Sequence, residues 1–403
     1  MKLGLLSGLK VLERGDSVAV AFAGKLLADL GADVVVVEPP GGSSLRRLPP
    51  YYEDVPGPER SVLYNWLSSN KRSMTLSLER ERGRAIFREL VRGVEMLLVK
   101  GKERGLDLTD LKEANPNLTV TTISPFGTEG PYANYRANDL VLFAISGFSY
   151  YLACPVDDPA ITPPKPNPGY QVGLVAGLSA ANASLWGLVA AKRKGRGVMV
   201  DVSEWEAFSQ LLYEHIGWLS EGKLTPDRKR LPGAAITVVG GLVWCLPCSD
   251  GWALVSPRED HQFKQWSEVI GEEEWARRPE FTTPDLRERN AWEIYERSAA
   301  WTKPRKKSEV ALAAQEKKVA CFPVNQMSDL PKMEQLTHRG FWTELEHSVI
   351  GGLKYPGLPV KIDDPDALPS RPAPRSGEHT LAILKELGIS SEEIKNLWQL
   401  AVI

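Results

Sequence analysis

The sequence has no excess of either charge and few cysteines. Its 403 residues include 49 Lys and Arg and 51 Asp and Glu, which gives a net charge of -2. A chain without a basic surplus is not expected to bind nucleic acid or an anionic membrane by broad electrostatic attraction. Four cysteines are too few for a disulfide scaffold. With 43% hydrophobic and 25% charged residues, the chain is neither disordered nor fibrous, and its length suggests two or three globular domains.

Motifs of several common enzyme classes are absent. The turn at residues 14–19 contains one glycine instead of the three of a dinucleotide-binding turn. No Walker loop and no Gly-x-Ser-x-Gly run occurs, and none of the five histidines stands in a metal-binding pair. Cys245 and Cys248 form a C-x-x-C pair, but they lie in a predicted strand and have no second Cys/His pair for zinc. We therefore expect no nicotinamide, nucleoside-triphosphate or serine-hydrolase chemistry and no bound metal.

Long apolar segments are also scarce. Residues 173–191 carry no charge over nineteen positions, close to the ~20 residues that span a bilayer. Glycine, serine and asparagine interrupt this segment and no second one resembles it, which favours a buried helix of a soluble protein. The apolar N-terminal stretch is broken by Gly4, Ser7 and Lys10 and is too short for a signal peptide. We expect a cytoplasmic protein that does not enter a membrane.

The sequence does contain a regular alternation of strands and helices. Apolar residues around Val11, a helical pattern over 18–30 and the β-branched run 34–37 predict a βαβ unit with a right-handed crossover. The alternation continues over most of the first two hundred residues, and the fold class that it predicts is α/β with an open parallel sheet. The further predicted strands are 96–99, 118–123 and 198–202, and the further predicted helices are 79–91, 173–191 and 204–218.

The composition changes between residues 234 and 321. Segments 238–246 and 252–255, joined by a Ser-Asp-Gly turn, predict a β-hairpin, and tryptophan-rich helical segments follow. Six of the twelve tryptophans lie between 205 and 275, where they either pack in a core or contact an aromatic or apolar acyl group. This region predicts a second, smaller domain, after which the chain ends in a helix at 380–387.

A basic motif precedes an alternating segment at residues 74–78. Lys71 and Arg72 are adjacent cations, flanked by Ser69, Asn70 and Ser73, which supply hydroxyl and amide donors. Such a group can bind phosphates at the edge of a strand, and it can equally be a solvated basic turn. The residues alone leave both interpretations open.

Taken together, motifs in a fixed order resemble the class III CoA-transferase family, which includes formyl-CoA and carnitine CoA-transferases and the acyl-CoA racemases. The resemblance covers nearly the whole chain. The matching stretches are 8–13, 26–34, 37–42, 70–76, 115–116, 126–131, 138–141, 146–147, 195–197, 200–203, 374–380 and 392–394.

The resemblance implies a Rossmann-like large domain with a parallel sheet, formed by residues 1–210 and 345–403, and a smaller inserted α+β domain at 232–325. It also implies an interlocked dimer. In such enzymes an aspartate carboxylate attacks an acyl-CoA thioester, forms a mixed anhydride and then carries CoA as an aspartyl thioester. Coenzyme A thioesters are therefore the expected substrates, and no permanently bound cofactor is expected.

The chain departs from the family at the nucleophile. Counted back from the Gly-Arg-Gly turn at 195–197, the aspartate position is occupied by Gly173, and no Asp or Glu occurs between Ala160 and Asp201. Pro39 replaces an arginine common in relatives, and the loop after 97–101 is shorter. The residues that still match a CoA site are Ser17, Val18, Ala19, Asn70, Lys71, Arg72 and Arg104.

Three functions fit this pattern. The resemblance is strongest to two-subunit members of the family, so the first is a non-catalytic subunit of a heterodimer whose homologous partner carries the aspartate. Such an enzyme moves CoA from succinyl-CoA to a carboxylic acid such as benzylsuccinate, a step of anaerobic toluene degradation. The second is a non-enzymatic acyl-CoA-binding protein. The third is an active homodimer with another nucleophile, for which the candidates are Glu129, Asp139, Asp157 and Asp158.

Overall fold

The computed structural model describes residues 4–103, 105–151, 156, 158, 160–165, 169–222, 242–363 and 369–403. The chain divides into two compact units. The larger consists of Met1–Ser149, Pro166–Leu224 and His338–Ile403, and the smaller of Tyr150–Lys165 and Thr225–Thr337. The predicted α/β class with a parallel sheet is confirmed.

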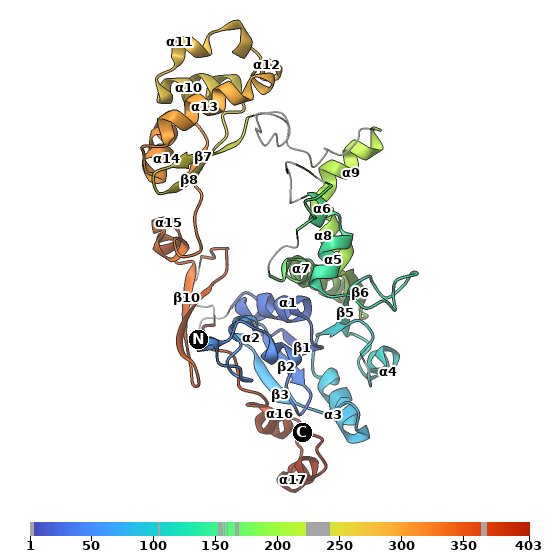
Figure 1. Cartoon of the computed structure of the whole chain (residues 1–403). Helices are drawn as coiled ribbons and strands as arrows, with labels where there is room; N and C mark the ends of the chain where they lie inside the picture. Colours follow the sequence, from blue (N-terminus) through green and yellow to red (C-terminus); the bar gives the residue numbers. More distant parts are fainter. Residues whose placement is uncertain are drawn as a thin grey trace. The chain divides into compact units, whose positions relative to one another are not determined.

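The larger unit is built on a six-stranded sheet with the order β3-β2-β1-β4-β5-β6, in which every neighbouring pair is parallel. The order reverses between β1 and β4, so the carboxyl ends of these two strands border the crevice where α/β proteins bind ligands. Figure 1 shows the sheet between its helices. The strands are β1 (Lys10–Arg14), β2 (Asp33–Glu38), β3 (Arg72–Thr75), β4 (Met96–Lys100), β5 (Thr119–Ser124) and β6 (Met199–Ser203).

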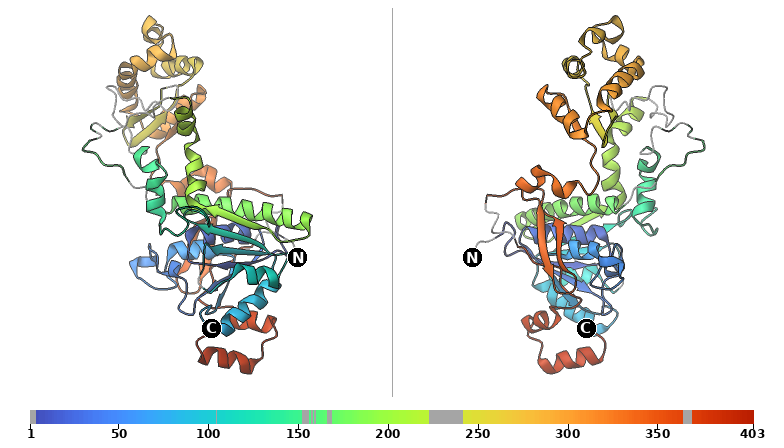
Figure 2. Two further views of the ribbon diagram at one scale, coloured as in Figure 1. Left: turned by 90° about the vertical axis from the view of Figure 1, so that its right-hand side faces the viewer. Right: turned by 60° about the vertical axis from the view of Figure 1, so that its left-hand side comes forward.

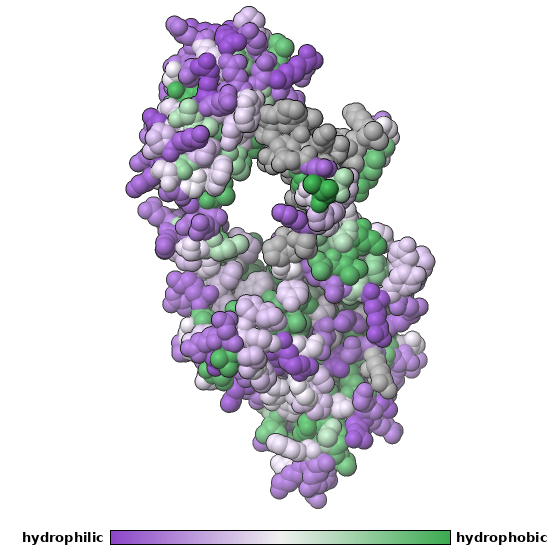
Figure 3. All heavy atoms as spheres, viewed as in Figure 1, coloured by the Kyte–Doolittle hydropathy of each residue, from purple (hydrophilic) through white to green (hydrophobic). Residues whose placement is uncertain are grey.

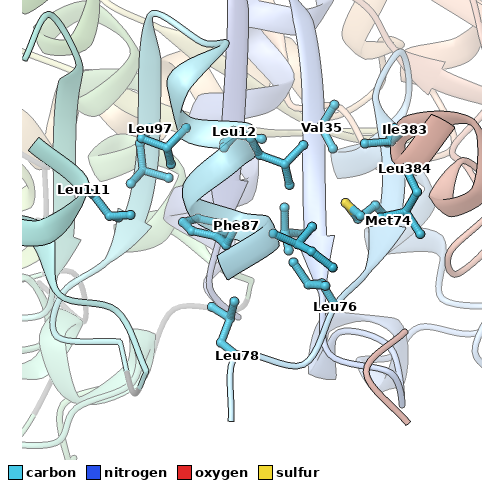
Figure 4. Close-up of a cluster of buried hydrophobic side chains, with 14 of the residues drawn as sticks. Leu12, Val35, Met74, Leu76, Leu78, Phe87, Leu97, Leu111, Ile383 and Leu384 are labelled. Atoms are coloured by element: carbon cyan, nitrogen blue, oxygen red, sulfur yellow. The ribbon is translucent and has the colours of Figure 1, made fainter. Parts of the chain in front are cut away.

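Successive residues of the central strands contribute to two different cores. Leu12 and Leu97 belong to the core shared with α3 (Glu81–Arg92), α4 (Leu108–Ala114), α16 (Thr380–Glu386) and α17 (Ser391–Gln399). Figure 4 shows this cluster around Phe87. Val11 and Leu98 belong to the opposite core, shared with α1 (Val18–Asp29) and α7 (Gln171–Lys194). The alternation follows from the two-residue period of a strand and explains the continuous apolar runs Val34–Val37 in β2 and Met96–Val99 in β4.

Helix α7 is the long uncharged segment of the sequence. Among the described residues it is the one helix long and apolar enough to cross a membrane. It packs on α1, β5 and β6, and Figure 2 shows it running across the sheet. Gly177 permits the close approach to α1, because a Cβ there would lie 2.6 Å from the Ala19 carbonyl oxygen. The helix ends at Gly195, which has a left-handed conformation and follows three basic residues. These contacts place one face of α7 in the core, while Leu178, Trp186 and Val189 are exposed.

One predicted helix differs from the structure, one helix was not predicted, and the predicted hairpin is confirmed. The helix predicted at 204–218 is divided into α8 (Glu204–Ser209), a short 3-10 helix at Gln210–Leu212 and α9 (Tyr213–Ser220). The C-terminal helix is followed by α17, which the sequence analysis did not predict and which Ser390 caps through the Glu393 amide. The predicted hairpin is β7 (Trp244–Cys248) and β8 (Gly251–Val255), while residues 238–241 lie outside the described residues.

The remaining elements complete both units. In the smaller unit β9 (Cys321–Pro323) joins β7 and β8 in an antiparallel sheet that packs against helices around Trp244 and Trp266. Those helices are α10 (Asp260–Ile270), α11 (Glu273–Ala276), α12 (Pro284–Arg289), α13 (Ala291–Thr302) and α14 (Lys307–Glu316), and α15 (Glu334–His338) follows them. The larger unit also contains α2 (Val62–Ser68), α5 (Asp139–Ile145) and the hairpin of β10 (Trp342–His347) and β11 (Gly351–Pro356), and the division between the units falls within α6 (Phe148–Tyr151).

Candidate active site

One glycine, Gly15, allows the chain after β1 to pass close to the end of β4. Gly15 follows β1 with φ +122, and a Cβ there would lie 2.5 Å from the Cβ of Lys100 at the end of β4. The Lys100 ammonium donates to the Asp16 carbonyl at 3.0 Å. Ser17 then begins α1, and its hydroxyl accepts a hydrogen bond from the Ala19 amide. The first turn of α1 is thereby fixed at the carboxyl edge of the sheet.

Gly173 lies against this first turn. A Cβ at residue 173 would lie 3.3 Å from the Val18 Cβ and 3.5 Å from the Ala19 nitrogen. The structure therefore brings together Gly173 and the turn Ser17-Val18-Ala19, which the sequence analysis placed in one site. A side chain at residue 173 would begin beside the amino end of α1, where the helix dipole stabilises a carboxylate. The glycine supplies no such group.

The carboxylate that does lie at the beginning of α7 is that of Asp139, a residue of α5. Its Oδ1 accepts a hydrogen bond from the Gly173 amide at 2.8 Å, and the Val172 amide also bonds to this carboxylate. Burial raises the pKa of Asp139, while the two amide bonds oppose that shift. The carboxylate thus serves as a cap for α7 while Asp139 is itself the first residue of α5.

The other candidate nucleophiles have different surroundings. Asp158 is exposed and accepts a hydrogen bond from the Ala160 amide. Glu129 is exposed beside a cavity of about 620 Å³ that lies along residues 101–108. That cavity is lined by one ammonium, Lys102, and by three carboxylates, so its charge does not favour a phosphate. Asp157 lies outside the described residues.

Glu204 is a carboxyl group at the crevice that the sequence analysis missed. It is the first residue of α8, directly after β6, and only 8% of its surface is exposed. Lys100, Asp139 and Ser17 are the polar residues that influence the pKa of this carboxyl group. Burial raises the pKa of Glu204 to about 7, although Lys100 opposes this. The sequence signal was a carboxylate at the carboxyl end of a predicted strand.

Lys71, by contrast, is bound inside the protein. Its ammonium is fully buried and donates to Glu13 Oε2 and to the Ala21 carbonyl, both at 2.7 Å. Burial lowers the pKa of Lys71 and raises that of Glu13, and in each case the partner opposes the shift. Gly24 leaves the necessary space, since a Cβ there would lie 1.9 Å from Glu13 Oε2. Lys71 is therefore not a solvated basic residue.

The neighbours of Lys71 are also held by protein contacts. Asn70 has φ +68, donates to Asp29 at 2.7 Å and accepts a hydrogen bond from the Arg371 amide at 2.7 Å. Arg72 pairs with Asp33 at 3.3 Å and with Glu386 at 2.6 Å. These contacts join β3 to α1 and to the C-terminal segment. A phosphate-binding role for residues 70–72 stays a prediction that these contacts do not support, and Arg104 lies outside the described residues.

The cysteines and tryptophans of the smaller unit have mainly a structural role, since most of them pack in its core. Burial raises the pKa of the Cys245 and Cys248 thiols, which disfavours thiolate chemistry. In the described part of the chain no three His, Cys, Asp or Glu side chains form a metal site. Trp244, Trp266 and Trp275 are buried in the core, whereas Trp252 is half-exposed.

Comparison with known proteins identifies relatives over the whole chain. Residues 6–380 match the sequence profile of CoA-transferase family III. The chain is 33% identical over 402 residues to succinyl-CoA:(R)-benzylsuccinate CoA-transferase subunit BbsE of Thauera aromatica, covering 95% of this chain and 94% of that protein. It is 28% identical to succinate–glutarate CoA-transferase of Agrobacterium fabrum, with 95% of each chain covered. A CAIB/BAIF family protein from Brucella suis has a similar structure, with a TM-score of 0.80, 26% identity and coverage of 96% of this chain and 100% of that one.

Proposed function

Since this chain belongs to CoA-transferase family III, we propose that it is the subunit of a heteromeric CoA-transferase that does not carry the nucleophilic aspartate. The observation that supports this most directly is Gly173, which lies 3.3 to 3.5 Å, measured from an added Cβ, from the first turn of α1. The position has the surroundings of a carboxylate site and lacks the side chain. A homologous subunit with an aspartate there supplies the nucleophile.

The proposed reaction moves CoA from succinyl-CoA to a carboxylic acid such as benzylsuccinate, as in anaerobic toluene degradation. The relative at 33% identity, a subunit of a benzylsuccinate CoA-transferase, supports this choice of substrates. CoA thioesters enter and leave as substrates, and no cofactor remains bound. The proposed location is the cytoplasm.

The proposed partner is the homologous subunit, in an interlocked heterodimer. Large apolar side chains are exposed on α5, α7 and α9, and Figure 3 shows apolar atoms gathered over the region of α5 and α8. Exposed apolar side chains gathered on one region are typical of a protein–protein interface. The exposed side chains are Leu140, Val141, Ile145, Leu178, Trp186, Val189, Tyr213, Ile216 and Leu219.

The test is co-expression with a homologous subunit that carries an aspartate at the position of Gly173. We expect a heteromer by native mass spectrometry that transfers CoA from succinyl-CoA to benzylsuccinate, and no transfer by this chain alone. The matched control is the heteromer in which the sister subunit's aspartate is replaced by asparagine, which should assemble and be inactive. Steady transfer by the purified chain alone, or by the control heteromer, would contradict the proposal.

A further inference from the structure

A cluster of aromatic rings lies at the carboxyl edge of the sheet, beside the strands that border the crevice. Phe126 lies two residues after β5, and Trp205 is the second residue of α8, which directly follows β6. Their ring centroids are 5.9 Å apart, and the rings meet edge to face. Both residues pack against the hydrophobic cluster that contains Val172, the residue before Gly173. The aromatic cluster is therefore continuous with the packing at the amino end of α7.

Two tyrosines extend this cluster to the surface. The Tyr132 ring lies 5.6 Å from the Phe126 ring and 6.4 Å from the Trp205 ring. The Tyr135 ring stacks on Tyr132 with a centroid distance of 4.9 Å and an interplanar angle of 26°. Tyr132 is 39% exposed and Tyr135 is 62% exposed. Since aromatic rings pair favourably at centroid distances of about 4.5–7 Å, the exposed surface of Tyr135 can accept a further ring.

The loop that carries the two tyrosines is held in place by hydrogen bonds. The Asp201 carboxylate of β6 accepts hydrogen bonds from the Thr128 amide at 2.9 Å and from the Thr128 hydroxyl at 2.8 Å. Gly130 has φ +89, and the Tyr135 amide donates to the Tyr132 carbonyl at 2.8 Å, which closes a turn between the two rings. A ligand that stacks here meets rings that are already positioned, so little ordering entropy opposes its binding.

A cation adjoins the ring pair in the chain. Arg136 directly follows Tyr135, is exposed, and forms no ion pair with another described residue. It is also not part of the lining of the acidic cavity beside Glu129. Lys102, whose ammonium donates to the Asn134 side chain at 3.3 Å, brings a second positive charge to the loop. An exposed aromatic surface with an available guanidinium suits a ligand that combines an aromatic ring with a carboxylate.

From this arrangement we propose that Tyr132, Tyr135 and Arg136 bind an aromatic carboxylic acid. The ring of the acid stacks on Tyr135 and continues the row of rings, and its carboxylate accepts hydrogen bonds from the Arg136 guanidinium. The inference rests on the proposed function for its substrate class, the carboxylic acids that receive CoA. It assigns preference for an aromatic over an aliphatic acid to a surface of this chain, although the chain lacks the nucleophile.

The experiment measures binding directly and does not depend on transfer. Saturation-transfer NMR is recorded for the purified chain and for the heteromer with benzylsuccinate and with the matched pair phenylacetate and cyclohexylacetate. We expect both aromatic acids to bind, and cyclohexylacetate to bind more weakly because its ring is not aromatic. Tyr135→Leu should weaken binding of the aromatic acids about two- to tenfold, the contribution of one aromatic pair. Tyr135→Phe keeps the ring and should retain the affinity.

Two further variants separate the charge and the position of the ring. Arg136→Gln should weaken binding and reduce its dependence on salt, because it removes the charge that attracts the carboxylate. Trp398→Leu removes an aromatic side chain that is 72% exposed on α17 and should leave binding unchanged. Since Tyr135 is itself largely exposed, Tyr135→Leu is expected to fold.

Three results would overturn the inference. The first is equal affinity of Tyr135→Leu and the wild type for the aromatic acids, and the second is binding of cyclohexylacetate as tight as that of phenylacetate. The third is loss of binding when the heteromer forms, which would assign the ring pair to the subunit interface.

The outcome is separate from that of the proposed function. Transfer by the heteromer together with unchanged affinity in Tyr135→Leu would contradict the inference alone. Binding that depends on Tyr135 without any transfer by the heteromer would contradict the proposed function alone.

Discussion

The Lys71 ammonium and the Glu13 carboxylate form an ion pair of 2.7 Å with almost no exposed surface on either side chain. Lys71 immediately precedes β3 and Glu13 lies in β1, so the pair ties together two strands that are separated by β2. The second hydrogen bond of Lys71, to the Ala21 carbonyl, attaches α1 to the same point. The basic motif thus stabilises the sheet beside the crevice.

Removing one partner of this pair is expected to destabilise the protein strongly. Lys71→Met leaves the Glu13 carboxylate buried without a cation, which costs about 3–5 kcal/mol of unfolding free energy. The double variant Glu13→Leu, Lys71→Met removes both charges and should recover much of that loss. Denaturant unfolding of the wild type, the single variants and the double variant measures this. Additive losses in the double variant would show that the two charges do not depend on each other.

The Asp139 carboxylate should contribute to stability through the beginning of α7. Asp139→Ala removes the acceptor for the Gly173 amide and is expected to cost about 0.5–2 kcal/mol, the usual range for loss of a helix cap. Asp139→Asn keeps an acceptor oxygen and should cost less. Thermal unfolding monitored by circular dichroism distinguishes the two variants. Equal losses for alanine and asparagine would indicate that the charge, rather than the hydrogen bond, matters.

Most of the sheet followed from the sequence because short apolar or β-branched runs alternate with helical segments along the chain. The strand order did not follow, since periodicity carries no information about which strands are neighbours. The break at Gln210–Leu212 was also missed, because its residues continue the apolar pattern of the helices on either side.

Within the site, Gly173 and the Ser17 turn were predicted together through resemblance to relatives. The burial of Lys71 was not predicted, because adjacent cations are usually exposed and its partner Glu13 lies far away in the sequence. Glu204 was missed for a similar reason. In the sequence it begins an amphipathic helix, and only the parallel arrangement of β1, β4 and β6 brings it to Ser17 and Lys100.

Stability should fall in mild acid through His379. Its Nδ1 accepts a hydrogen bond from the Ser73 amide at 3.2 Å, and burial lowers the pKa of this histidine below its usual value near 6.5. The unfolded chain therefore binds the proton more readily, so the unfolding free energy decreases as pH falls below 6.5. His379→Asn keeps an acceptor without a titrating ring and should show a smaller decrease between pH 7 and 5.5. His347, whose pKa burial also lowers, is present in both proteins and cancels in the comparison. Parallel pH profiles would contradict this assignment.

Glu204 should have the opposite effect on the pH dependence of stability. Its folded-state pKa of about 7 lies above the ordinary value of 4.5, so the folded state binds the proton more tightly. The stabilisation that Glu204 gives the folded state through this proton is fully present below pH 4.5 and is lost as the pH rises through 7. Glu204→Gln should therefore be more stable than the wild type at pH 8, by at most about 3.4 kcal/mol (about 2.5 pH units at 1.36 kcal/mol per unit), and much closer to it at pH 5. Urea unfolding at both values measures the difference. A variant that is less stable at pH 8 would show that the ionised carboxylate is well accommodated.

Restoring the aspartate alone should not restore steady transfer. In Gly173→Asp the new Cβ lies 3.3 Å from the Val18 Cβ, which is a tight contact. The Val18 side chain must therefore shift by a few tenths of an ångström to accommodate the aspartate beside the first turn of α1. The retained basic residues Lys71 and Arg72 form ion pairs with Glu13, Asp33 and Glu386, so we expect them to contribute little to binding of the CoA phosphates. We expect the purified variant to fold, as judged by circular dichroism, and to give no more transfer from succinyl-CoA to benzylsuccinate than Gly173→Asn, which has the same shape without the charge. Substantial turnover by Gly173→Asp and none by Gly173→Asn would mean that the nucleophile was the single function lost from this crevice, and that the chain binds CoA through contacts other than residues 70–72.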